Sequence, residues 1–272
     1  AYRAATSLYG SDLPEVKLVS IGDVNAQFGE AAAKRFGFER HDADWRTIAD
    51  DPNIHAVSVV VANHLHREIV EGLLAAGKHV LCEKPLSDTL DDARAMVKAA
   101  AEAKSIARIG LTFLRNPAIA AIQQLIASGE LGKVLHFSGK YWADYSADPM
   151  NPIAWRYKGG MGTGALADVG SHISYVAEFI TGKPFSAVSG ARFVTAITER
   201  PVATGAVQGH GAAPVSDKFD TVENDDYAGF TAQFGDIAGS IEVSRVASGH
   251  PTSLGFEVYC EKGAARFTQA RN

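Results

Sequence analysis

Two hydrophobic patterns alternate along the first 113 residues of the chain. Short continuous apolar runs predict strands, and helical spacing predicts helices, in the order 16–23 (strand), 26–36 (helix), 55–62 (strand), 65–76 (helix), 79–82 (strand), 89–103 (helix) and 106–113 (strand). Gly37 and Gly77 stand where the first two helices should end, and Thr89 with Asp92 marks the start of the third. Apolar strands alternating with amphipathic helices predict a doubly wound parallel sheet buried on both faces.

The pattern changes in the second part of the chain. A helix at 117–128 and a strand at 134–145 lead, through an aromatic and glycine-rich loop, into a helix at 164–180. Strand signals then dominate, at 185–198, 227–234, 239–246, 254–260 and 264–268. The stretch 199–218 is rich in Gly, Ala and Pro and is expected to form a long loop or an excursion at the sheet edge. The fold class is therefore predicted to be α/β. Residues 1–114 should form the parallel-sheet domain, and residues 115–272 an α+β domain with a large, mostly antiparallel open sheet.

Composition narrows the class of partner. The 272 residues are 21% charged with a net charge of -5, so the chain has neither a basic footprint for nucleic acid nor a polybasic membrane signal. No apolar run approaches the roughly 18–20 residues that span a bilayer, and residues 1–10 lack the features of a signal peptide. Cys82 and Cys260 show no CxxC spacing and suit a reducing compartment. We expect a cytoplasmic protein with a small-molecule partner, and neither nucleic acid nor membrane.

Lys84 is the first candidate for chemistry. It follows the strand predicted at 79–82 and precedes Pro85, which disfavours helical geometry at the residue before it. Ligands of open α/β sheets bind just outside the carboxyl ends of the strands, so Lys84 should project into such a crevice. A surface lysine beside a turn proline is the alternative, and only the remaining motifs decide between the two interpretations.

Asp23 ends the first predicted strand, where an acidic residue can bind the ribose 2′-hydroxyl of a dinucleotide and favour NAD over NADP. A helix N-cap would use the same residue equally well. The usual G-x-G-x-x-G turn is absent and residues 2–5 already have the pattern of the helix after it. We therefore expect the first strand and its glycine turn to be missing from this sequence. Gly162, Gly164 and Ala167 fit G-x-G-x-x-A, but no buried strand precedes them, so this match is rejected.

Asp168 and His172 are four residues apart in the helix predicted at 164–180, so they should share one face. Gly170 lies between them, although a glycine inside a helix costs about 1 kcal/mol relative to alanine. We expect this glycine to admit a flat ring, such as a nicotinamide, close to the helix. A solvated Asp and His pair, contributing only about a few tenths of a kcal/mol, is the alternative.

Two further groups of residues have more than one interpretation. His64 and His66 form an H-x-H pattern after a strand, but two histidines without a further ligand motif do not complete a metal site. We predict no metal, and a helix-capping or cofactor-lining role for these histidines. Tyr141, Trp142 and Trp155 could form a wall for stacking sugars or could pack in the core.

These motifs together resemble the Gfo/Idh/MocA family, the group of glucose-fructose oxidoreductase and inositol dehydrogenase. Four segments carry the resemblance: Gly77 to Pro85 (G-K-H-V-x-x-E-K-P), Gly164 to His172 (G-x-x-x-D-x-G-x-H), Asn63 with His66 (from T-P-N-x-x-H), and Leu125 to Gly132. Val61 and Ala62 replace the Thr and Pro of the third motif. The chain also departs from the family pattern at both ends, because the glycine turn is missing and the length after the last strand is short.

The resemblance implies a Rossmann-like first domain and a second domain whose open sheet associates into a homodimer or homotetramer. It implies Lys84, Asp168 and His172 as the catalytic residues. From the motifs we assign cofactor binding to Asp23, Asn63, His66, Glu83 and Lys84. Tyr141, Trp155 and Arg156 are the predicted substrate contacts.

The predicted reaction is the transfer of a hydride between a secondary hydroxyl of a cyclitol or sugar and NAD, as in inositol 2-dehydrogenase. His172 would be the general base, because an imidazole accepts protons near neutral pH. Asp168 would orient it or hold a neighbouring hydroxyl, and Lys84 would stabilise negative charge on the reacting oxygen. Two alternatives remain: a catalytically silent relative that senses NAD or a sugar, and a metal-dependent hydrolase that uses His64 and His66.

Overall fold

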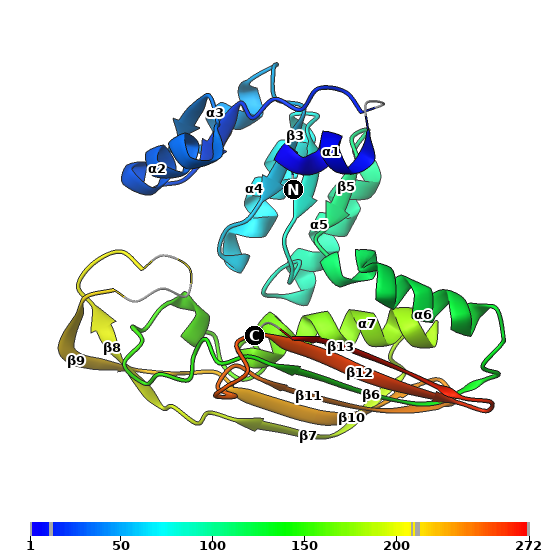
Figure 1. The fold of residues 1–272 in the computed structure, drawn as a ribbon. Coiled ribbons are helices and arrows are strands. Elements are labelled where there is room, and N and C mark those ends of the chain that lie inside the picture. Colours follow the sequence, from blue (N-terminus) through cyan, green and yellow to red (C-terminus); the bar gives the residue numbers. More distant parts are fainter. Residues whose placement is uncertain (1, 11–12, 208, 210–212, 271–272) are drawn as a thin grey trace. The chain divides into compact units, whose positions relative to one another are not determined.

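The computed structural model describes residues 2–10, 13–207, 209 and 213–270 of the chain. They form two compact units, residues 1–110 and residues 111–272, which are coloured from blue to green and from green to red in Figure 1. None of the helices in these described ranges is long and apolar enough to cross a membrane.

The first unit alternates strands and helices, as predicted. Its elements are η1 (Tyr2–Ala4), α1 (Ala5–Tyr9), β1 (Ser20–Gly22), α2 (Ala26–Phe36), β2 (Arg40–Asp42), α3 (Trp45–Asp50), β3 (Ala56–Val59), η2 (Asn63–Leu65), α4 (His66–Ala75), β4 (His79–Cys82), α5 (Leu90–Glu102) and β5 (Ala107–Ile109). All pairings are parallel, and the described strands form two sheets, β1-β2 and β3-β4-β5. The parallel α/β architecture is thus confirmed, while β2 and α3 were not predicted.

Local capping explains where these helices begin and end. The Asn25 side chain accepts the Phe28 N–H at the start of α2, and Gly37, with φ of 75°, ends that helix. Gly77, with φ of 77°, follows α4. The Thr89 side chain accepts the Asp92 N–H at the start of α5. The helix ends at Gly37 and Gly77 and the helix start at Thr89 were therefore predicted correctly, because capping depends only on neighbouring residues.

The three-stranded sheet is buried on one face. Val80 and Cys82 of β4 are buried with Leu73 of α4 and Met96 of α5. The alternate residues of β4 point to the other face, where Leu81 is 42% exposed. Helices α4 and α5 thus pack on one face of the sheet, and Tyr2 of η1 reaches Ser58 of β3 on the other.

The second unit is built on one large sheet. Its elements are η3 (Thr112–Arg115), α6 (Pro117–Ala127), β6 (Val134–Trp142), η4 (Trp155–Tyr157), a π-helical turn η5 (Leu166–Gly170), α7 (Ser171–Thr181), β7 (Ala187–Val194), β8 (Glu199–Ala203), β9 (Val215–Thr221), β10 (Tyr227–Phe234), β11 (Ile237–Ser244), β12 (Ser253–Cys260) and β13 (Ala264–Ala270). Six strands form a sheet in the order β13-β12-β6-β11-β10-β7. All neighbours are antiparallel except β6 and β11, so the predicted mostly antiparallel sheet is confirmed.

Helices α6 and α7 lie over one face of this sheet (Figure 1). Ile173, Val176 and Ile180 of α7 are buried against Phe137 and other inward-facing side chains of the strands. Gly139 of β6 permits the close approach, because a Cβ at this position would lie 2.6 Å from Ile173 Cγ1. The helix that contains His172 is thereby seated on the middle of the sheet.

The stretch predicted as a long loop contains regular structure. Strands β8 and β9 pair antiparallel in a separate two-stranded sheet, and the turn between them includes residues 208 and 210–212, which lie outside the described ranges. The hydrophobic alternation that predicts strands is weak here, because β8 contains Pro201 and most residues of β9 are polar. The predicted edge excursion is therefore a hairpin.

Candidate active site

Lys84 lies two residues after β4, at the carboxyl end of the parallel sheet, as predicted. Its backbone N–H donates to Glu83 Oε2 at 3.1 Å, and the Lys84–Pro85 peptide bond is cis. Glu83 also packs against Gly110, where a Cβ would lie 3.1 Å from Glu83 Oε1. The Gly110 N–H in turn donates to Cys82 O at 2.7 Å. The strand end that carries Lys84 is thus tied to the end of β5.

His66, predicted to bind the cofactor, is a buried residue in the structure. The side chain is 0% exposed, its Nδ1 lies 3.1 Å from Pro85 O, and its Nε2 lies 3.2 Å from Val61 O. His66 holds the backbone that follows Lys84, a role that the sequence pattern alone did not reveal.

Asp23 follows β1 at its carboxyl end, and its Oδ1 accepts the Asn25 N–H at 2.8 Å. The N-cap of α2 is Asn25, so the alternative interpretation of Asp23 as the cap is wrong. Asn63 lies in η2, directly after the loop that follows β3. Both residues therefore occupy the carboxyl-end side of parallel strands, where ligands of α/β sheets bind.

Asp168 lies in the π-helical turn η5, and His172 in the first turn of α7. The predicted single helix is thus a π turn followed by an α-helix. Asp168 Oδ2 accepts a 2.6 Å hydrogen bond from the Tyr145 hydroxyl, a length typical of an O–H donor on an ionised carboxylate. Burial and the negative charge of Asp168 raise the pKa of Tyr145 well above its usual value, so this hydroxyl keeps its proton.

Aromatic side chains surround His172. Its Nδ1 lies 2.8 Å from the Tyr175 hydroxyl, which also accepts the Phe113 N–H at 3.2 Å. The Phe113 ring meets the imidazole edge-on at 5.1 Å between ring centres, and the Tyr141 ring lies at 5.7 Å. Tyr141 lies near the end of β6 and Tyr145 just after it, so Asp168 and His172 both contact tyrosines from the same end of one strand.

The two glycines of this segment serve internal packing. A Cβ at Gly170 would lie 2.9 Å from Leu166 Cδ1 and 3.4 Å from Val243 Cγ2, so this glycine faces the sheet. The expectation that Gly170 admits a nicotinamide ring is therefore wrong. A Cβ at Gly164 would lie 2.2 Å from Asp225 O, which makes Gly164 the position where backbone approach excludes any side chain.

A buried polar cluster holds the start of this helical segment. The Asp225 carboxylate is 0% exposed and accepts the backbone N–H groups of Gly162, Gly164 and Leu166 at 2.7, 3.3 and 2.8 Å. Its neighbour Asp226 forms a buried ion pair with Arg245 at 2.8 Å. The glycines of the rejected G-x-G-x-x-A match therefore bind a carboxylate of the protein, and no strand of the structure directly precedes them.

This packing gives a stability prediction. Replacing Gly164 with alanine should lower the free energy of unfolding by roughly 1–3 kcal/mol, because the new methyl group would overlap the Asp225 backbone. Gly205 is the matched control, since an added Cβ there meets no atom within 4 Å and the variant should unfold like the parent. Urea unfolding measures both. Equal stability of the two variants would contradict the proposed interlock of Gly164 with Asp225.

Trp155 and Arg156 lie in η4 at the surface of the second unit. Trp155 is 42% exposed, and the Arg156 guanidinium stacks 4.4 Å from the centre of its ring. The Arg156 backbone carbonyl accepts hydrogen bonds from Asn224 and Arg245, which anchors this turn to the buried polar cluster. Both side chains are thus presented on a fixed backbone, in contrast to Tyr141, which is 8% exposed.

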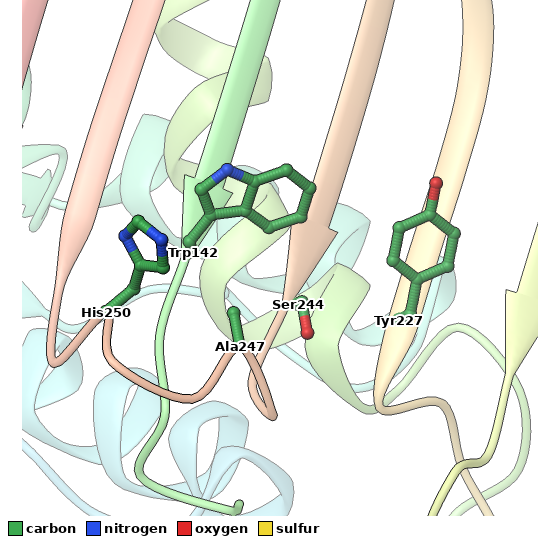
Figure 2. A pocket seen from close by; sticks show the side chains of 5 residues that line it. All are labelled: Trp142, Tyr227, Ser244, Ala247 and His250. Carbon is green, nitrogen blue, oxygen red and sulfur yellow. The ribbon is translucent and has the colours of Figure 1, made fainter.

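Other kinds of site find less support. Among the described residues, no three His, Cys, Asp or Glu side chains are grouped so that they could hold a metal ion. Burial raises the pKa of Cys82 to about 12, so this residue is a thiol rather than a nucleophilic thiolate. A shallow depression of about 290 Å³ contains Trp142, Tyr227 and His250 among its lining residues (Figure 2). Trp142 points to the opposite face of the sheet from Tyr141, so this depression is separate from Asp168 and His172.

Comparison with known proteins explains the arrangement. Residues 2–111 match the family described as an oxidoreductase family with an NAD-binding Rossmann fold, and residues 119–266 match the GFO/IDH/MocA C-terminal domain. The chain belongs to the Gfo/Idh/MocA oxidoreductase family. The resemblance inferred from the motifs is thus confirmed over nearly the whole chain.

Two curated relatives illustrate the range of the Gfo/Idh/MocA family. Levoglucosan dehydrogenase of Pseudarthrobacter phenanthrenivorans is 37% identical over 254 residues, which are 92% of this chain and 65% of that protein. The scyllo-inositol 2-dehydrogenase (NAD(+)) of Bacillus subtilis is 28% identical over 180 residues, 66% of this chain and 51% of that protein. The chain therefore spans about half to two thirds of the length of these relatives.

A solved structure supports the same assignment. Levoglucosan dehydrogenase in complex with NADH and L-sorbose is similar with a TM-score of 0.88 and 33% identity, over 98% of this chain and 68% of that chain. The complex of that enzyme with NADH and levoglucosan has a TM-score of 0.86 and 34% identity. The fold of the Gfo/Idh/MocA family is thus present across both units.

Sequence reasoning missed several residues around the predicted catalytic pair. Tyr175 stands three residues after His172 in α7, and this helical spacing was a usable signal. Tyr145 and Phe113 carry no such signal, because they come from segments that are distant in the sequence from the residues they contact. Asp225 is equally distant, 59 to 63 residues from the N–H groups that it binds.

Proposed function

We propose that this chain is part of an NAD-dependent oxidoreductase that transfers a hydride between a secondary hydroxyl of a sugar or cyclitol and nicotinamide. The observation that carries the proposal is the pair of Asp168 and His172 on one helical segment, each hydrogen-bonded to a tyrosine hydroxyl. The names of the relatives, levoglucosan dehydrogenase and scyllo-inositol 2-dehydrogenase, support a polyhydroxylated ring as the substrate class.

The residues of the first unit fit a dinucleotide. Asp23 offers a carboxylate at the carboxyl end of a parallel strand, where it suits a ribose 2′-hydroxyl and disfavours the 2′-phosphate of NADP. Asn63, Glu83 and Lys84 follow β3 and β4 of the other parallel sheet and are the other proposed contacts. NAD, when bound, supplies the hydride acceptor.

His172 is proposed as the general base that takes the proton of the reacting hydroxyl. For Nε2 to accept that proton, Nδ1 must carry the other one and donate it to the Tyr175 hydroxyl, 2.8 Å away. The Tyr175 oxygen also accepts the Phe113 N–H, which fixes its position. The Tyr175 hydroxyl can either donate to Nδ1 or accept from it, so the proposed mechanism requires the tautomer of His172 in which Nδ1 is the donor.

Asp168 and Lys84 complete the proposed catalytic set. Asp168 would hold a hydroxyl of the ring next to the reacting one or orient the imidazole. Lys84 would bind the reacting oxygen, and its positive charge would stabilise the negative charge that develops there. Tyr141, Trp155 and Arg156 are the proposed substrate contacts. The exposed Trp155 ring supports this role, because aromatic faces stack on sugar rings.

A substrate screen tests the function. The protein is mixed with NAD or NADP and a panel that includes levoglucosan, scyllo-inositol, myo-inositol and glucose, and reduction of the cofactor is followed by absorbance. We expect reduction of NAD by at least one cyclic polyol and weaker or no reduction of NADP. Tight binding of NAD without turnover of any polyol would contradict the enzyme and favour a protein that senses NAD or a sugar.

We also propose that copies of the chain associate into a homodimer or homotetramer through the sheet face that α7 does not cover. Small side chains lie near the middle of this face, where the hydroxyl groups of Ser138 and Ser240 are 3.3 Å apart. Replacing Ser240 with arginine should shift the protein to a smaller species in analytical ultracentrifugation, because a charged chain would protrude from the interface. Ala121→Arg, at an exposed position of α6, is the control, and a monomeric parent would refute the proposal.

A further inference from the structure

Tyr145 has a contact that the catalytic roles described above do not use. It lies three residues after β6, and its hydroxyl donates to Asp168 Oδ2 at 2.6 Å. The two residues are 23 positions apart in the sequence, on different elements. The bond therefore links the π-helical turn that carries Asp168 to the end of the central strand.

The backbone around Tyr145 is held on several sides. The Asn151 side chain donates to Tyr145 O at 3.1 Å, and the next residue, Ser146, donates its N–H to Arg245 O at 3.0 Å. Ser146 O in turn accepts a 2.5 Å hydrogen bond from the buried Arg200 guanidinium. A donor on such a fixed backbone can hold its acceptor in one orientation at little further cost in entropy.

Tyr145 engages one of the two oxygens of the Asp168 carboxylate. An aspartate side chain has a broad preference at its second torsion angle, so position alone does not decide which oxygen points where. Asp168 lies in a π-helical turn, and such turns occur often at functional sites. Because the two oxygens of a carboxylate have a fixed geometry, the hydrogen bond to Oδ2 also decides the direction of Oδ1.

We propose that Tyr145 is a positioning residue that holds the Asp168 carboxylate in the single orientation needed to bind the substrate or His172 during the reaction. The expected effect on kcat rests on the proposed function, whereas the expected effect on the orientation of the Asp168 carboxylate does not. The raised pKa of Tyr145 is consistent with this role, because a hydroxyl that stays protonated remains a donor throughout the working pH range.

Tyr157 is a matched control for a merely structural tyrosine. It lies in η4, is buried, and its hydroxyl makes a 3.0 Å hydrogen bond to Ser146 Oγ. Replacing either tyrosine with phenylalanine removes one hydroxyl, and with it the bond to Asp168 in one case and the bond to Ser146 in the other. The two variants should therefore lose similar stability, while only Y145F removes a bond to Asp168 itself.

Kinetics and a double-mutant cycle provide the first test. With the polyol found by the screen, Y145F should lower kcat by roughly 10-fold to 100-fold, since a hydrogen bond to a charged group is lost at the transition state, while Y157F keeps the parent kcat. In an Asp168→Asn background the effect of Y145F should largely disappear, because it acts through that carboxylate. An unchanged kcat of Y145F, or equal losses in Y145F and Y157F, would overturn the inference.

Crystal structures of the parent, Y145F and Y157F provide a test without turnover. The Asp168 carboxylate should keep its parent orientation in Y157F and depart from that orientation in Y145F. One unchanged orientation in all three would overturn the inference. If the parent oxidises no polyol, the proposed enzyme fails, whereas this comparison still decides whether Tyr145 positions Asp168.

Discussion

Replacement of Lys84 with methionine is expected to lower kcat by about 100-fold to 1000-fold, the range found when a group that stabilises a developing oxyanion is removed. Methionine keeps a long apolar stem of similar reach but carries no charge. The fold should survive, because the backbone N–H bond from Lys84 to Glu83 and the Gly110 bond to Cys82 do not involve the ammonium group. Steady-state kcat and KM for the polyol and for NAD measure the effect.

The pattern of the change distinguishes the two roles proposed for Lys84. A fall in kcat with little change in the KM for NAD supports a role at the reacting oxygen, whereas a rise in the KM for NAD alone would leave only a cofactor contact. Lys98→Met is the control, since Lys98 is exposed on α5 and its nearest carboxylate oxygen, Glu102 Oε1, is 3.9 Å away. Near-normal turnover of K84M would contradict a catalytic role of Lys84 and support its interpretation as a surface lysine.

Replacement of His172 with asparagine should have an effect of comparable or greater size. Removal of a general base lowers the rate by about 100-fold to 10,000-fold, because the hydroxyl proton then has no acceptor of suitable basicity. Asparagine is similar in length and can still hydrogen-bond the Tyr175 hydroxyl, so the helix should remain seated on the sheet. The packing of the imidazole on Phe113 and Tyr141 is lost, and circular dichroism and thermal unfolding measure the structural part of the change.

A pH series separates the chemical from the structural part. Activity of the parent should fall as the pH is lowered, because a protonated imidazole accepts no further proton, and the residual activity of H172N should lack this decrease. His55→Asn, at an exposed position of the first unit, should leave both rate and profile unchanged. A pH profile of H172N that parallels the parent profile would exclude His172 as the base.

The elements of the fold were largely readable from local signals. The Thr89 cap and Gly37 and Gly77 marked helix limits correctly, since each acts on residues within one helical turn. Strand limits were predicted too long, as in 16–23 against Ser20–Gly22, because the apolar run extends beyond the strand to residues such as the exposed Val16. The hairpin β8-β9 was missed, because its pairing depends on residues far apart and its sequence lacks apolar alternation.

Some features of the candidate site could likewise be read from the sequence, and others could not. The sequence by itself determined the succession of a parallel and a mostly antiparallel sheet, Lys84 at a strand end, and the four-residue spacing of Asp168 and His172. These are properties of short segments, where periodicity and neighbouring residues decide the conformation.

Only the tertiary structure decided which groups these residues meet. It enclosed His66 among backbone carbonyls, turned Gly170 towards the sheet, placed Asp225 under the start of the helical segment, and brought Tyr145 to Asp168. Contacts of this kind join residues that are tens of positions apart. They follow from how strands and helices pack, because a side chain's direction and burial depend on elements that no local pattern specifies.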